Sequence, residues 1–175
     1  NARQLARALN INHAHVNKLC KGLADKKLLI KEEIGYSTYF SYDYKNKLAV
    51  KFMEYMLSQE EKDFPKWLSV LLHSLNKFKP CISLGFVFGS SIKSKNFNDI
   101  DVLLMYKKEK SEEVNKIKDE IRKSQQLEKP VRYLEITEKD ILKNIKDKVF
   151  YNILSDNLIF HNPEKYVEVL KKCHK

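Results

Sequence analysis

The chain has 175 residues and carries 33 Lys and Arg residues against 23 Asp and Glu residues, a formal net charge of +10. This length suits one ordinary domain or two small ones. The positive charge favours an anionic partner such as nucleic acid or a nucleotide, although a solvated lysine-rich surface would give the same excess. The cysteines Cys20, Cys81 and Cys173 lack metal-ligand spacing, so we expect a reducing, cytoplasmic setting. No apolar run approaches the roughly 20 residues that span a bilayer, and we expect no membrane partner.

The first 46 residues contain two kinds of apolar pattern. Between Ala2 and Leu29 the apolar residues recur every three to five positions, which predicts two short helices with a break at Asn10-Ile11-Asn12. The segment from Leu29 to Asp43 is rich in Ile, Tyr, Thr and Phe around Gly35, which predicts a β-hairpin. The stretch ARQLARALNINHAHVNKLCKGLADKKLLIKEEIGYSTYFSYD therefore resembles a winged helix-turn-helix domain. The first helix of that family is missing or lies upstream of Asn1, which fits a chain trimmed at its start.

The winged-helix resemblance implies contact with double-stranded DNA. It places the helix from about His13 to Lys26 in the major groove, and residues 1–46 carry eight Lys and Arg against four Asp and Glu. The polar side chains that would meet phosphates and base edges are His13, His15, Asn17, Lys18 and Lys21. A winged helix that reads a palindrome would favour a homodimer. The alternative is a protein-binding winged helix whose basic face is only solvated.

The remaining residues predict a linker helix at 47–61 and a second domain at 62–175. In the second domain a helical segment ends before Pro80, and CISLGFVF and DIDVLLMY read as buried strands. A charged helix from about Lys110 to Gln126 and a third strand, VRYLEIT, follow. This order predicts an α+β fold, with a small mixed sheet and helices packed on it.

Two aspartates stand at the start of the strand DIDVLLMY. Residues two apart on a strand point to the same face, so Asp99 and Asp101 project together and repel each other unless a cation lies between them. Mg²⁺ prefers one or two carboxylates together with phosphate oxygens, which suits a metal–nucleotide site. Gly89 allows close backbone approach, and Ser90 and Ser91 offer hydroxyls and N–H donors to a phosphate. The simpler interpretation is a solvated turn that leads into a strand.

The segment FGSSIKSKNFNDIDVLLMY resembles the Gly-Ser and Asp-x-Asp signature of the DNA polymerase β-like nucleotidyltransferase superfamily, especially its minimal archaeal and bacterial members. The resemblance covers residues 62–175, because NLIFHNPEKYVEVLKK is similar to the closing segment of these domains. It implies that Gly89 and Ser90 hold the β- and γ-phosphates and that Asp99 and Asp101 ligate two Mg²⁺ ions.

The chain departs from this pattern in its loop. The family often has a basic residue and then Gly shortly after Gly-Ser, whereas this chain has Lys93-Ser94 and a loop about two residues shorter. Lys93 can neutralise phosphate, but Ser94 lacks the backbone freedom of glycine. The third carboxylate of the family takes a proton from the acceptor hydroxyl, and Glu135 in VRYLEIT is its candidate. The alternative for Glu135 is an exposed edge-strand residue.

The resemblance implies Mg²⁺-dependent transfer of a nucleoside monophosphate, with ATP as the expected donor, to a hydroxyl acceptor. Minimal nucleotidyltransferases are often paired with HEPN-type toxins, and the acceptor is then a tyrosine of the toxin. One alternative is a DNA-binding transcriptional regulator whose nucleotidyltransferase domain has lost catalysis and senses a nucleotide. Another is an interaction module that neutralises a toxin by contact alone.

Overall fold

The computed structural model describes residues 1–175 except 60–63, 65, 95, 125–128, 145–146 and 174–175. The chain divides into two compact units, Asn1–Tyr55 and Met56–Lys175. This division falls inside helix α3 (Lys47–Gln59), which occupies most of the linker helix expected at 47–61. Residues 60 and 61 of that expected helix lie outside the described residues.

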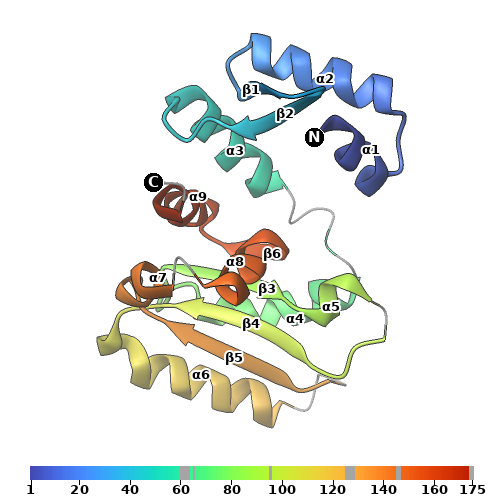
Figure 1. Ribbon diagram of the computed structural model, residues 1–175. Coiled ribbons are helices and arrows are strands. Elements are labelled where there is room, and N and C mark those ends of the chain that lie inside the picture. Colours follow the sequence, from blue (N-terminus) through green and yellow to red (C-terminus); the bar gives the residue numbers. More distant parts are fainter. Residues whose placement is uncertain (60–63, 65, 95, 125–128, 145–146, 174–175) are drawn as a thin grey trace. The chain divides into compact units, whose positions relative to one another are not determined.

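The first unit begins with two helices and a hairpin (Figure 1), formed by α1 (Ala2–Leu9), α2 (His13–Asp25), β1 (Leu29–Ile34) and β2 (Ser37–Tyr42). Asn10 ends α1 in the left-handed conformation, with φ 52°. Asn12 starts α2, because its Oδ1 accepts a hydrogen bond from the backbone N–H of Ala14 at 2.8 Å. The expected helices and the break between them are therefore confirmed.

The hairpin of the first unit turns at Gly35, whose φ is 57°. Its strands pair antiparallel from Leu29 opposite Tyr42 to Ile34 opposite Ser37, which confirms the expected hairpin. The buried core of this unit is small and joins both helices to the hairpin. Its residues are Ala2, Ala6, Val16 and Cys20, with Leu29 and Phe40 packed against them.

The second unit contains a four-stranded sheet in the order β5-β4-β3-β6. The strands are β3 (Leu84–Phe88), β4 (Ile100–Met105), β5 (Val131–Ile136) and β6 (Asn157–His161). β4 and β5 pair parallel, whereas β3 pairs antiparallel with both β4 and β6. The chain is thus an α+β protein with a mixed sheet, as expected, and β6 is a strand that the sequence analysis did not predict.

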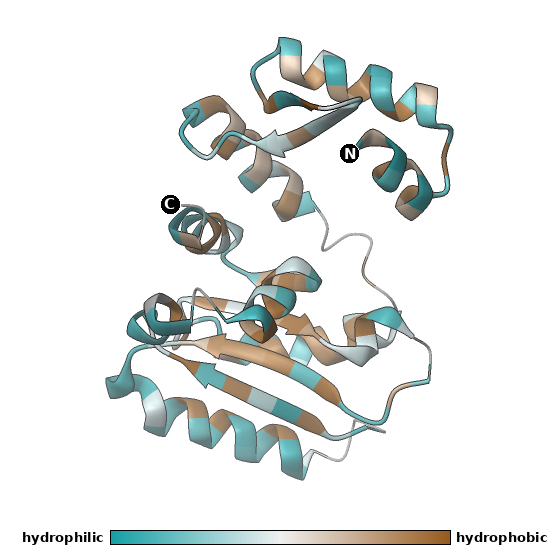
Figure 2. Cartoon of the chain, in the orientation of Figure 1, coloured by the Kyte–Doolittle hydropathy of each residue, from teal (hydrophilic) through white to brown (hydrophobic). Residues whose placement is uncertain are grey.

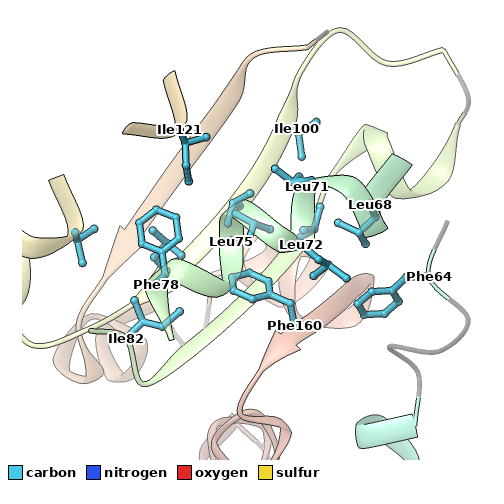
Figure 3. Packing of buried hydrophobic residues seen from close by; sticks show 14 of the residues in the cluster. Phe64, Leu68, Leu71, Leu72, Leu75, Phe78, Ile82, Ile100, Ile121 and Phe160 are labelled. Carbon is cyan, nitrogen blue, oxygen red and sulfur yellow. The ribbon is translucent and has the colours of Figure 1, made fainter. Parts of the chain in front are cut away.

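Helices cover both faces of this sheet (Figure 1). Residues of α4 (Lys66–Leu75) and α6 (Ser111–Lys123) pack on one face, around Leu71, Leu75 and Phe78 (Figure 3). The other face is covered by α7 (Glu138–Asn144), α8 (Lys148–Ser155) and α9 (Pro163–Cys173). Shorter helical turns are η2 (Asn76–Phe78), α5 (Ser90–Lys93) and η3 (Lys108–Lys110).

Among the helices of the described residues, none combines the length and apolar character that crossing a membrane requires.

The central and edge strands differ in composition. β4 is apolar along most of its length, whereas β5 alternates between polar and apolar residues (Figure 2). Within β4 every residue is buried except Asp101, which is half-buried. A negative charge at this position requires an opposite charge or hydrogen bonds nearby, because the surrounding strand is packed on both faces.

Candidate functional site

A tight turn at the end of β3 is built around Gly89. This residue has φ 84° and ψ −150°, a conformation that residues with a side chain rarely adopt. A Cβ atom at Gly89 would lie 2.4 Å from Oδ2 of Asp101, closer than Cβ atoms come to their neighbours in proteins. The strand register explains this proximity, since Phe88 is paired with Asp101. The turn and the carboxylate therefore lie against each other, and a side chain at position 89 would require Asp101 to move.

The two aspartates lie close enough to affect each other. Asp99 immediately precedes β4, and its side chain is 17% exposed. The pKa of Asp101 is raised, first because the carboxyl is removed from water and second because of the negative charge of Asp99. The structure thus brings together the two carboxylates that the sequence analysis singled out, beside Gly89.

Arg132 is a third charged residue at this position, and the sequence analysis did not identify it. β4 and β5 run parallel with Asp101 directly opposite Arg132, so both side chains lie on the same face. Arg132 Nη1 lies 3.0 Å from Asp99 Oδ2, and its positive charge partly offsets the rise in the pKa of Asp101. The signal in the sequence that could have identified Arg132 is its positive charge inside the predicted strand VRYLEIT.

Glu135 does not join the aspartates, and its expected role as the third carboxylate has no support from the strand register. Its register partner is Leu104, three residues from Asp101, and residues three apart on a strand face opposite sides. Glu135 Oε1 lies 2.7 Å from Lys118 Nζ, and Tyr106 donates its hydroxyl hydrogen to the other oxygen. Burial alone would raise the pKa of Glu135, but the hydrogen bonds with Lys118 and Tyr106 and the charge of Lys118 lower it overall. Glu135 is therefore an ion-paired residue on the face covered by α6.

The residues after Gly89 differ in their access to a ligand. Ser90 is exposed, whereas Ser91 is 3% exposed and donates its hydroxyl hydrogen to the carbonyl of Phe88 at 3.3 Å. The Ser91 hydroxyl thus stabilises the turn from inside, and the structure does not direct it toward a ligand. Lys93 Nζ lies 2.8 Å from Asp156 Oδ2, and both side chains are more than half exposed. Such an exposed ion pair is weak, so Lys93 can exchange Asp156 for a phosphate oxygen.

The five candidate DNA-binding residues of α2 do not share one face. Val16 and Cys20 are buried and define the inner face of the helix. The residues expected to contact DNA are His13, His15, Lys18 and Lys21, which are exposed, and Asn17, which is half-buried. His13 and Asn17 line a hollow together with residues of α1 and β2 such as Thr38. At 100° per residue, Lys18 and Lys21 lie on the outer side, opposite the buried residues.

The aspartate pair can hold a metal ion only with help from a ligand or water. Among the described residues, no group of three His, Cys, Asp or Glu side chains is placed to bind a metal. Asp99 and Asp101 nevertheless fit Mg²⁺, which takes one or two carboxylates and completes its shell with water and phosphate oxygens. The pKa of Asp101 is raised first by burial and second by the charge of Asp99, and a bound cation would offset both effects.

A separate hollow of about 520 Å³ lies between α6 and β5. It is lined by Lys118, Arg122 and Lys129, together with Tyr133, and it touches neither aspartate. Lys118 is paired with Glu135, and none of the described residues that line the hollow is a carboxylate that could hold a metal ion. The aspartate pair and Gly89 therefore remain the candidate site.

Comparisons with known proteins give no match to this chain: no protein-family model, curated protein or solved structure is similar to it at a significant level. The resemblance to nucleotidyltransferases accordingly depends on the residues of the sequence motif alone.

Proposed function

We propose that the chain is a nucleotide-responsive DNA-binding protein: its second unit binds a nucleoside triphosphate with Mg²⁺, and its first unit binds double-stranded DNA. The observation that carries the nucleotide proposal is the contact between the Gly89 turn and Asp101. A phosphate-sized ligand needs a turn without a side chain, and a metal that neutralises it needs carboxylates beside that turn. Asp99 supplies the second carboxylate.

The phosphates would lie along the turn. Ser90 is exposed there, and Lys93 can exchange Asp156 for a phosphate oxygen. Asp99 and Asp101 would hold Mg²⁺, which, when bound, neutralises phosphate charge and orients the triphosphate. ATP is the expected nucleotide.

The residues around Asp99 and Asp101 favour a nucleotide-sensing role over a transferase role. Nucleotidyl transfer to a hydroxyl is accelerated by a side chain that is placed to accept the proton of that hydroxyl. Glu135 lies on the other face of the sheet, and the residue opposite Asp101 is Arg132, which stays protonated and cannot accept a proton. Nucleotide binding would then alter DNA binding by α2 and the hairpin, with two copies on a palindromic site.

Nucleotidyl transfer is the second candidate, favoured by the proximity of Asp99, Asp101 and Gly89. In that reaction the acceptor oxygen forms a bond to the α-phosphorus and the bond to the β-phosphate oxygen breaks. Pyrophosphate leaves, and the acceptor proton passes to water. The acceptor would be a hydroxyl, such as a tyrosine of a HEPN-type toxin.

Labelled nucleotide separates the two candidates. The protein is incubated with Mg²⁺, ATP labelled at the α-phosphate, and the acceptor, and covalent label is compared with bound label. The sensing proposal predicts bound label that is released on denaturation, with none on the acceptor. Covalent label that disappears in Asp99→Ala, but persists in the exposed control Asp119→Ala, would overturn it in favour of transfer.

A further inference from the structure

We propose that Arg132 acts as an internal cation of the site, so that the aspartate pair holds one divalent cation with the nucleotide and not two. This inference rests on the proposed nucleotide-binding function and specifies the metal content of the same site. It starts from position: Arg132 lies across from Asp101 in β5, and its guanidinium contacts Asp99 at 3.0 Å.

The charges of the site support this assignment. Asp99 and Asp101 together carry two negative charges, and Arg132 neutralises one of them. Among the described residues near the turn, Lys93 is paired with Asp156 until a phosphate displaces it, so its charge is not counted here. A single divalent cation therefore leaves the site with net charge +1, which suits a triphosphate. A second divalent cation would be placed next to a guanidinium, where repulsion opposes its binding.

The position of Arg132 also explains the missing third carboxylate. A carboxylate that joined the pair from β5 would have to stand on the face of Asp101, and the residue directly opposite is Arg132. Glu135 faces α6 and is bound by Lys118. The chain thus places a positive charge where a further metal-binding carboxylate would have to stand.

The first test counts the bound ions. Full-length protein is loaded with Mn²⁺ and a non-hydrolysable ATP analogue, and electron paramagnetic resonance distinguishes one isolated Mn²⁺ from two spin-coupled ions. We expect an isolated ion in the wild type and in the control Arg122→Asp, an exposed arginine on α6. We expect two spin-coupled Mn²⁺ ions in the variant Arg132→Asp. A coupled pair in the wild type, or an isolated ion in Arg132→Asp, would overturn the proposal.

A second variant removes the charge without adding a ligand. Arg132→Gln should raise the affinity for Mn²⁺ alone by about tenfold, because the repulsion at this distance is lost. A change below about twofold would show that the guanidinium is a surface ion pair without influence on the metal, and would reject the inference. If no variant binds Mn²⁺ or the analogue, the proposed nucleotide site itself is wrong, and this result is distinct from binding with two ions.

Discussion

Asp101 lies in surroundings that disfavour its negative charge. It stands in a strand that is otherwise buried, and burial and Asp99 raise the pKa of its carboxyl. A pKa that is higher in the folded than in the unfolded state means that ionisation destabilises the fold above that pKa. In the metal-free protein, the ionised carboxylate of Asp101 therefore lowers the stability of the fold at neutral pH.

Asp101→Asn removes this charge and keeps the shape of the side chain. At pH 7 without Mg²⁺ we expect the Tm of the second unit to rise by on the order of 2 °C. As the pH falls through the raised pKa, the wild-type carboxyl becomes neutral as well, so the difference should shrink. Trp67, the one tryptophan of the chain, lies in α4 and reports this unfolding by fluorescence.

The control for this variant is Asp119→Asn, because Asp119 is exposed on α6 and its pair with Arg122 is at the surface. We expect no rise in Tm for this control. A lower Tm for Asp101→Asn, or a difference that does not depend on pH, would contradict the assignment of an uncompensated charge.

Gly89 is the second residue with a demanding environment. Gly89→Ala places a Cβ against Asp101 and forces a side chain into a backbone conformation with φ 84°. We expect a loss of about 2 kcal/mol in the free energy of unfolding of the second unit, measured in urea through Trp67. Ser90→Ala, at the exposed next residue, should change it by less than about 0.5 kcal/mol. Equal stability of the two variants would show that the turn does not require glycine.

At the level of elements, apolar periodicity in the sequence predicted the first unit well. The two helices and the hairpin follow from local patterns, since Asn10, Asn12 and Gly35 mark their ends. β6 was not predicted, because its apolar part is only Leu158-Ile159-Phe160 between polar neighbours. It is a strand because β3 offers an edge, and Gly85 leaves room there for the ring of Phe160.

The outer side of α2 carries the prediction for DNA. If Lys18 and Lys21 contact phosphates, the double variant Lys18→Ala, Lys21→Ala should bind duplex DNA more weakly. The slope of log affinity against log salt concentration should fall by about 2, since each lost contact removes about 0.9. Fluorescence anisotropy with a labelled duplex at several salt concentrations measures this slope.

The matched control for DNA binding is Lys116→Ala with Lys143→Ala, which removes the same charge from exposed positions of the second unit. This control should keep the wild-type slope. If both double variants lose affinity equally, α2 is not the binding element and only net charge matters.

For the whole molecule, the sequence was more informative about the parts of the site that are close in the chain. The spacing of Asp99 and Asp101 and the nearby Gly89 predicted a shared location, because strand geometry relates them directly. Arg132 and Glu135 depend on the parallel register of β5 against β4, which joins residues about 30 positions apart. Local pattern does not determine that register. The third carboxylate was therefore assigned to a residue on the wrong face.

The central claim is that the second unit binds a nucleoside triphosphate with Mg²⁺ at the aspartate pair. Isothermal titration of ATP into the full-length protein, with Mg²⁺ and with chelator, tests it most directly. The account predicts Mg²⁺-dependent binding that weakens at least about tenfold in Asp101→Asn and is unchanged in Asp119→Asn. Binding that is absent, or that ignores both Mg²⁺ and Asp101→Asn, would contradict it.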